Sequence, residues 1–191
     1  RKLNIFAGLD FAFSLSKRAD STCLVVVGVD SDHNYYVLDI ERFKSDRIAD
    51  YFDAILRTHR KWGYKKIRCA VTVAQQVIVR DLKENYIKPH GLNLIVDEYR
   101  PNRHEGSKEE RVAATLEPKY DNRQMWHYKG GEINALEEEL TLAKPPHDDI
   151  KDALTAAIDI AVAPMARRSS YRAANNIVVN GRFGGVSFIG H

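Results

Sequence analysis

Hydrophobic residues gather at the start of the chain into three short runs that predict β-strands. Residues 3–11 (LNIFAGLDF) and 22–29 (TCLVVVGV) are almost wholly apolar, as expected of strands buried on both faces. Residues 35–43 (YYVLDIERF) alternate between apolar and polar positions, which is typical of a strand with one exposed face. The turn-forming residues 30–34 (DSDHN) predict a hairpin, so we expect these strands to be antiparallel.

The pattern then changes to helices that alternate with strands. Apolar residues recur at helical spacing over 45–62, with Ser45 as the predicted N-cap and Gly63 as the stop. The later segments are predicted as a strand at 66–73, a helix at 75–88, a strand at 92–99, a helix at 107–116, a short strand at 125–128, a helix at 133–142 and a last helix ending at Pro164. Strands separated by single helices are joined by right-handed crossovers and lie parallel. We therefore expect an α/β fold whose mixed central sheet has three antiparallel strands, then parallel ones, flanked by helices.

The end of the chain has a different character. Its basic part contains Arg167, Arg168 and Arg172. Asn180-Gly181, between two apolar runs, predicts a type I′ hairpin turn. We therefore divide the chain into one domain, residues 1–166, and a basic tail with a β-hairpin, residues 167–191. Because the chain starts without Met or an apolar leader, we expect it to be a piece of a longer polypeptide.

Composition narrows the function classes only slightly. No apolar run is long enough to span a bilayer, so we expect no membrane partner. The formal net charge of +3 permits a polyanionic partner without requiring one. No Walker A motif is present, because Gly106-Ser107-Lys108 lacks the upstream glycine, and this excludes an ATPase of that class for this piece.

Asp10 is the first candidate for chemistry, because it interrupts an apolar strand. An ionised carboxylate between Leu9 and Phe11 must be solvated at the sheet's end, paired, or bound to a cation. The alternative is that Asp10 caps a turn at the end of its strand. Asp20 lies where the first hairpin returns toward the same strand end, and it is either a further acid of the site or a loop cap.

A second group of acids, Asp148, Asp149 and Asp152, precedes the last apolar helix. At these spacings the carboxylates crowd one end of a helix and repel each other unless a positive charge lies between them. Their purely structural interpretation is stabilisation by the helix dipole. Carboxylates from separate elements are the ligands that Mg²⁺ and Mn²⁺ select, and such ions activate water for phosphodiester hydrolysis. Together with Asp10, the group predicts a metal site.

The order of these segments resembles the C-terminal nuclease domain of the large terminase subunit of tailed bacteriophages. The resemblance spans nearly the whole chain and rests on Gly8-Leu9-Asp10, the hairpin with Asp20, residues 69–73, residues 100–111 and residues 147–154 (HDDIKDAL). It implies an RNase H-like fold and an endonuclease that cuts concatemeric double-stranded DNA during genome packaging with two Mg²⁺ or Mn²⁺ ions. It also implies an N-terminal ATPase domain on the same polypeptide, the portal protein and the small terminase subunit as partners, and the host cytoplasm as location.

The resemblance also assigns roles to residues. Asp10 matches the metal ligand of the first strand, and Asp149 and Asp152 match ligands on the last helix, with Asp148 adjacent. Asp20 matches an auxiliary acid of the first hairpin. These matches imply that Asp10, Asp149 and Asp152 are catalytic.

The chain departs from this pattern at Thr72, where the resemblance implies a further catalytic acid at the end of the fourth strand. A hydroxyl can bind a hard cation, but it does not neutralise its charge as a carboxylate does. Three interpretations stay open: an engineered inactivating change, a natural departure, or replacement of the acid by Asp97 or Glu98 of the next strand.

Basic residues beside the predicted site are candidates for binding DNA. They are Lys108, Arg111, Arg100 and Arg103. The first two begin a predicted helix and could hold the scissile phosphate, and the alternative is a solvated surface. His147 is either a partner of a metal ligand or a helix cap. We also keep two other functions open: a docking or DNA-binding module of the packaging motor whose tail contacts the portal, with weak or lost hydrolysis, and a junction resolvase.

Overall fold

The computed structural model describes residues 2–12, 21–72, 75–100, 106–142 and 145–165. Asp20, Arg103 and the tail 167–191 with its predicted hairpin lie outside the described residues. The division between the domain and the tail therefore stays a prediction.

A six-stranded mixed sheet forms the centre of the described structure. Its strands are β1 (Asn4–Asp10), β2 (Thr22–Val29), β3 (Tyr35–Phe43), β4 (Lys66–Ala70), β5 (Ile95–Tyr99) and β6 (Met125–Trp126). In the order β5-β4-β1-β2-β3-β6, the pairs β1–β2 and β2–β3 are antiparallel, and the pairs β1–β4, β4–β5 and β3–β6 are parallel. The predicted mixed sheet is confirmed, and β1 lies in its middle.

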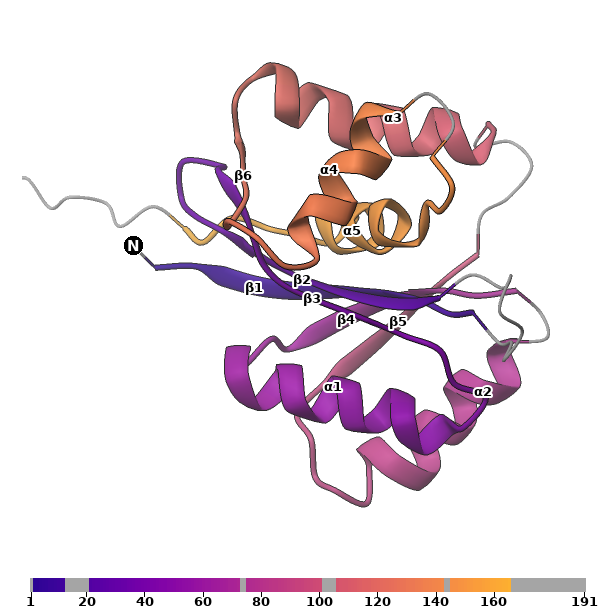
Figure 1. The fold of residues 1–191 in the computed structure, drawn as a ribbon. Coiled ribbons are helices and arrows are strands. Elements are labelled where there is room, and N and C mark those ends of the chain that lie inside the picture. The colour runs from indigo at the N-terminus through magenta and orange to yellow at the C-terminus, as the bar shows by residue number, and fades with distance from the viewer. Residues whose placement is uncertain (1, 13–20, 73–74, 101–105, 143–144, 166–191) are drawn as a thin grey trace, which may run out of the picture.

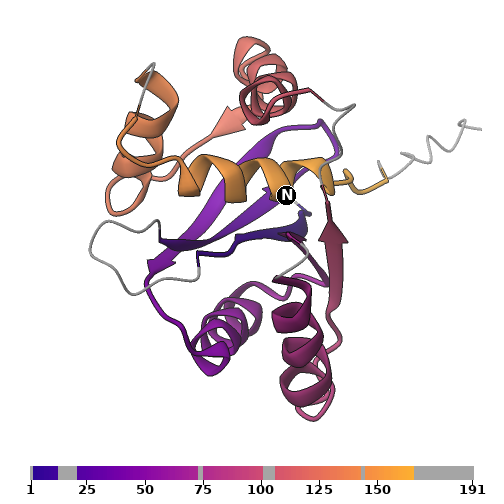
Figure 2. The same ribbon diagram turned by 90° about the vertical axis from the view of Figure 1, so that its right-hand side faces the viewer.

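Helices cover both faces of this sheet (Figure 1). They are α1 (Ile48–Trp62), α2 (Gln75–Asp81) continued by the π-helical turn η1 (Leu82–Ile87), α3 (Lys108–Asp121), α4 (Ile133–Thr141) and α5 (Asp149–Asp159). Figure 1 shows α1 and α2 on one face and α3, α4 and α5 on the other, and Figure 2 shows α5 running across the strands. Each face has its own buried apolar cluster, so the sheet is packed on both sides, as its apolar inner strands require. No helix in the described part of the chain is both long and apolar enough to span a membrane.

Three helix ends differ from the prediction, and one is the end of α5, which lies at Asp159 and not at Pro164. Ser45 is not the N-cap of α1, because Arg47 occupies that position; the Ser45 hydroxyl instead accepts the Arg47 N–H at 3.0 Å and donates to Asp50 at 2.5 Å. Gly63 ends α1 in the left-handed conformation, as predicted. The helix α3 continues to Asp121, past its predicted end, because Leu116 and Tyr120 still pack against the core on that face of the sheet.

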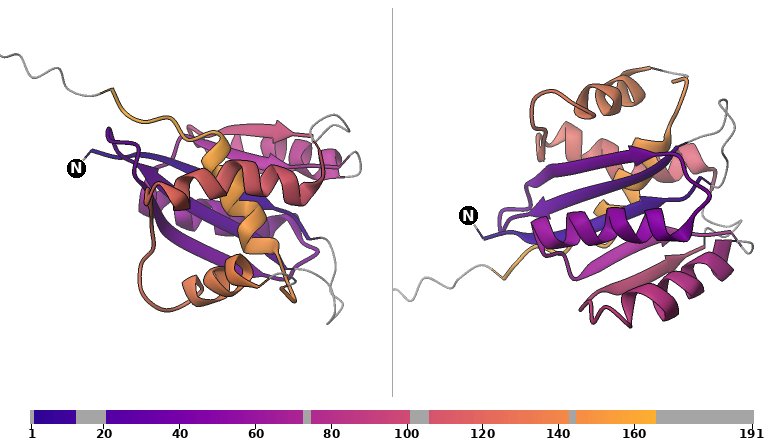
Figure 3. Two further views of the ribbon diagram at one scale, coloured as in Figure 1. Left: turned by 90° about the horizontal axis from the view of Figure 1, so that it is seen from above. Right: turned by 60° about the horizontal axis from the view of Figure 1, so that its bottom comes forward.

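A close approach between α5 and β1 sets the position of the last helix. A Cβ atom added at Gly8 would overlap the backbone oxygen of Ala153 and lie 2.6 Å from the backbone nitrogen of Ala157. Glycine in the strand and alanines on the helix therefore let the two backbones come together, and Figure 3 shows α5 crossing over β1. Since Gly8 is two residues before Asp10, this packing also fixes where the first turn of α5 lies relative to that carboxylate.

Candidate active site

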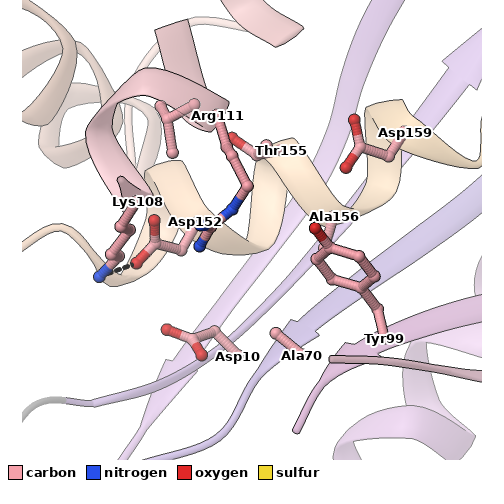
Figure 4. A pocket seen from close by; sticks show the side chains of 10 residues that line it. Asp10, Ala70, Tyr99, Lys108, Arg111, Asp152, Thr155, Ala156 and Asp159 are labelled. Atoms are coloured by element: carbon pink, nitrogen blue, oxygen red, sulfur yellow. Dashed lines mark ion pairs between the residues drawn. The ribbon is translucent and has the colours of Figure 1, made fainter. Parts of the chain in front are cut away.

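A small pocket lies between the C-terminal ends of the central parallel strands and the helices α3 and α5 (Figure 4). Its volume is about 190 Å³, and it is lined by Asp10, Ala70, Tyr99, Lys108, Arg111, Val112, Asp152, Thr155, Ala156 and Asp159. Each of β1, β4 and β5 contributes its last residue. Side chains from separate elements therefore converge at one edge of the sheet, the usual place for a ligand in a fold with parallel strands.

Asp10 is the last residue of β1, at the C-terminal ends of the parallel strands, and its carboxylate is directed toward α5 (Figure 4). Its strand neighbours in the register are Cys23 on β2 and Ala70 on β4, and neither can neutralise its charge. Burial and, to a smaller extent, the carboxylate of Asp152 raise the pKa of Asp10 to about 7, against the opposing charge of Lys108. A nearby cation therefore favours the charged form of this carboxylate.

The three acids at the start of α5 occupy different environments, and a fourth, Asp159 at the end of this helix, also lines the pocket. Asp152 lines the pocket, and burial raises its pKa to about 6 although Lys108 opposes the shift. Asp149 is buried, and one of its carboxylate oxygens accepts the Ser21 N–H at 2.8 Å. Asp148 is the N-cap residue of α5 with a side chain 41% exposed, so it forms the outer side of the group. The three carboxylates therefore lie together at the start of α5, as the sequence predicted.

Two basic residues of α3 face these acids. The ammonium group of Lys108 lies 2.8 Å from Asp148 Oδ2 and also forms an ion pair with Asp152 (Figure 4). Burial alone would lower the pKa of Lys108, but its hydrogen bonds to the two carboxylates outweigh this and raise it well above the ordinary value. Arg111, one turn later, lines the same pocket and donates to the Gly106 carbonyl at 2.9 Å.

The donor set matches the chemistry of a hard divalent cation. Asp10 and Asp152 supply carboxylate oxygens from two elements, and a cationic ammonium group already lies at this cluster. Within the described ranges, however, no three His, Cys, Asp or Glu side chains are arranged as a ready metal site. Asp10, Asp149 and Asp152 are therefore brought to one region without being arranged as ligands of one ion.

Thr72 is placed outside the pocket. It is exposed and lies between β4 and α2, where it bonds the first residue of α2: its N–H donates to Gln75 Oε1 at 2.8 Å, and its carbonyl accepts the Gln75 N–H at 3.1 Å. The residue of β4 that lies beside Asp10 is Ala70. The sequence predicted a strand over 66–73 and therefore did not single out Ala70. The strand ends at Ala70, which pairs with Asp10, and this register follows from the pairing of β4 with β1.

The two acids considered as substitutes on β5 have other partners. Asp97 accepts a hydrogen bond from Arg68 at 2.6 Å and forms a second ion pair with Lys66, and Glu98 pairs with Lys83. Neither lines the pocket. Nothing in this geometry favours the replacement of a catalytic acid by Asp97 or Glu98.

The remaining candidates lie at the edge of the site or outside it. Arg100 directly follows β5 and is exposed, and His147 is exposed before α5; neither lines the pocket. Arg103 and Asp20 are outside the described residues. Because Ser21 binds Asp149, the residue after Asp20 does reach the acid group.

A buried acid that sequence reasoning missed supports α5 from behind. Glu139 on α4 is 4% exposed, and its Oε2 accepts the Lys151 N–H at 2.8 Å in the first turn of α5. Burial and, to a smaller extent, the charge of Asp149 raise the pKa of Glu139 to about 7, although the hydrogen bond from Lys151 opposes the shift. The residue pattern does not indicate that Glu139 is buried, because it follows two other glutamates, Glu137 and Glu138. Only the packing of α4 on α5 decides which of the three is buried.

Comparisons with known proteins identify the fold. The chain is similar to the crystal structure of the large terminase nuclease from the thermophilic phage G20c, with a TM-score of 0.56 and 15% identity over 84% of each chain. Weaker likenesses include RuvC from T. thermophilus (TM-score 0.48, 16% identity, 81% of this chain and 90% of that chain) and the yeast mitochondrial Holliday junction resolvase Ydc2 (0.49, 10%, 80% and 77%).

The likeness to the terminase nuclease, together with the strand order, shows the RNase H-like fold that the resemblance had implied. At 15% identity it shows the fold alone. No protein-family model and no curated protein matches the sequence. The function of this chain must therefore be argued from its own site.

Proposed function

We propose that this chain is a metal-dependent endonuclease domain that cuts double-stranded DNA. The observation that carries the proposal is a convergence of side chains in one small pocket: the carboxylates of Asp10 on β1 and Asp152 on α5, and the cationic side chain of Arg111 on α3. Hydrolysis of a phosphodiester requires carboxylates that bind metal ions and a cationic group that binds phosphate.

The residues divide this work between them. Asp10 and Asp152 would hold Mg²⁺ or Mn²⁺, with Asp149 and Asp148 adding negative charge from the first turn of α5. Two such ions, when bound, lower the pKa of an attacking water and stabilise the leaving oxygen. Arg111 faces the same pocket and would bind a phosphate oxygen. Arg100, at the outer edge, would bind the DNA backbone beyond it, and we assign the same role to Arg103.

The shape of the site favours a substrate recognised by its backbone. The pocket is small, and the basic groups that line it, Lys108 and Arg111, are side chains suited to phosphate. We infer that cutting is not sequence-specific.

Genome packaging is the biological setting that we propose for this activity. The substrate would then be concatemeric viral DNA in the cytoplasm of an infected host. The partners would be an ATPase domain on the same polypeptide, the small terminase subunit and the portal protein, with the tail 167–191 as the portal contact. The similarity of fold to a phage terminase nuclease supports this setting.

The test is cleavage of supercoiled plasmid by the full chain with Mg²⁺ or Mn²⁺. Asp10→Ala and Asp152→Ala should reduce cleavage at least about a hundredfold, because each removes a group that stabilises the transition state. Asp53→Ala is the matched control, since Asp53 is an exposed carboxylate on α1, across the sheet from the pocket. If Asp10→Ala and Asp53→Ala cleave at the same rate, the assignment is wrong.

A second candidate function is DNA binding with weak or lost hydrolysis. The observation that favours it is Ala70, because β4 contributes no acid to the pocket beside Asp10. Comparing the rates of Thr72→Glu and Ala70→Glu with that of the unchanged chain tests this. A gain with Thr72→Glu supports the interpretation that Thr72 replaces a catalytic acid. A gain with Ala70→Glu alone places the missing acid at the pocket wall, and equal rates in all three chains argue against a missing acid.

A further inference from the structure

Lys108 occupies the carboxylates that the proposed metal would need. Its ammonium group pairs with Asp152, which lines the pocket, and with Asp148 at the outer side. Figure 4 shows this group at the Asp152 carboxylate, above the side chain of Asp10. Lys108 also lowers the pKa of Asp10, so its charge acts on both carboxylates that would hold the ion.

The position of Lys108 is fixed by the start of its helix. Ser107 and Glu110 form a reciprocal capping box: the Ser107 hydroxyl accepts the Glu110 N–H at 3.1 Å, and Glu110 Oε2 accepts the Ser107 N–H at 2.7 Å. A lysine in the first turn is opposed by the positive end of the helix dipole. The helix itself therefore gains nothing from this charge, and the acids of α5 are what stabilise it there.

The ion pairs of Lys108 are of a kind that another cation can break. The Lys108 side chain is 47% exposed and Asp148 is 41% exposed, so solvent screens this pair and it stabilises little. Asp152 is only 12% exposed, so its pair with Lys108 is screened from the side of the ammonium group alone. Its long flexible stem allows the ammonium group to move away without a change in the backbone. A divalent cation carries twice the charge and is bound by the same oxygens.

We propose that Lys108 is a built-in competitor of the metal: its ammonium group neutralises Asp152 and Asp148 in the metal-free protein, and a divalent cation enters by displacing it. This inference rests on the proposed function and concerns the control of its metal site. It gives Lys108 two states, one paired with the acids and one released. The released side chain lies beside Arg111 at the pocket, where it can bind a phosphate oxygen.

The direct test is Mn²⁺ binding to the full chain, followed by the electron paramagnetic resonance signal of free Mn²⁺ in the absence of DNA. Lys108→Gln removes the competing charge and should tighten Mn²⁺ binding about tenfold, as expected for the loss of two weak ion pairs. Lys108→Met should act in the same direction, because it also lacks the charge. Lys108→Arg keeps the charge and should bind Mn²⁺ within about threefold of the unchanged chain.

Lys151→Gln is the matched control. Lys151 lies in the first turn of α5, as Lys108 lies in the first turn of α3, but it lines the groove between α3 and α4 instead of the pocket. Its removal should change Mn²⁺ affinity less than about threefold, because it forms no ion pair with these acids among the described residues. Equal tightening in Lys108→Gln and Lys151→Gln would mean that only the overall charge matters, and it would overturn the proposal.

Thermal unfolding provides a second reading that does not depend on cleavage. Without metal, Lys108→Gln should lower the melting temperature, because the acids then repel without a counter-charge. Saturating Mn²⁺ should raise the melting temperature of this variant more than that of the unchanged chain. Unchanged or weaker Mn²⁺ binding by Lys108→Gln refutes the competitor role. Mn²⁺ binding that behaves as expected in a chain that does not cut DNA would refute only the nuclease function.

Discussion

The contact between Gly8 and α5 gives the sharpest prediction, because one methyl group should disturb both the fold and the site. In Gly8→Ala the new Cβ overlaps the backbone oxygen of Ala153 and lies 2.6 Å from the nitrogen of Ala157. These are atoms of a helix backbone, which cannot rotate away, so the whole helix must move.

The magnitude follows from two opposing effects. Overpacking costs about 1–3 kcal/mol, and a collision with backbone places this substitution at about 3 kcal/mol. Replacing glycine by alanine in a strand recovers roughly 0.5–1 kcal/mol. The net loss in the free energy of unfolding is thus about 2 kcal/mol, which lowers the urea midpoint by about 1 M for a slope of about 2 kcal/mol/M.

Gly28→Ala is the matched control in the neighbouring strand. Its Cβ would lie 3.0 Å from Leu3 Cδ1 and 3.1 Å from Leu38 Cδ1, the ends of side chains that can rotate. We expect a change below about 1 kcal/mol, because the repacking cost and the gain in the strand nearly cancel. Urea unfolding followed by circular dichroism measures both variants. Equal midpoints for Gly8→Ala and Gly28→Ala would refute the close-packing argument.

Two further predictions concern charge. The folded-state pKa values of Asp10 and Asp152 lie above the ordinary value of 3.8, so the metal-free folded chain binds more protons than the unfolded chain up to about pH 7. Its stability should therefore fall as the pH rises through this window. Asp10→Asn should make this fall smaller, as measured by thermal unfolding in the presence of a chelator. An unchanged slope of melting temperature against pH would contradict this prediction. In the turn between β2 and β3, Asp30 accepts the Asp32 and Asn34 N–H groups at 2.9 Å, so Asp30→Ala should cost about 2 kcal/mol in urea unfolding. Asp32→Ala, at an exposed side chain, should cost almost nothing.

The amino-acid sequence determines the elements of this fold because their signals are local. The apolar runs of β1 and β2, the alternation in β3 and the helical spacing of α1 and α5 each predict their own structure. The capping box at Ser107 and the stop at Gly63 are confirmed for the same reason, since each depends on residues within one turn. Ser45 shows the limit of this reasoning, because a residue suited to capping bonds another part of the same turn instead.

The acids of the site were also found in the sequence, because an acid inside an apolar strand and three acids before a helix are conspicuous by themselves. Their relation to each other was not. Only the packing of α5 on β1 at Gly8 brings Asp152 to Asp10, and only the strand register places Ala70 beside Asp10 while Thr72 lies outside the pocket.

Tertiary structure alone decided the electrostatics of the site. Lys108 is forty residues from Asp148 in sequence, and the sequence predicted it either as a phosphate-binding residue or as part of a solvated helix surface. Its pairing with the acids exists because α3 and α5 cross on one face of the sheet (Figure 3), and the first turn of α3 meets the first turn of α5. Coulomb interactions depend on distance in space and on burial, and neither quantity can be predicted from the local pattern of residues.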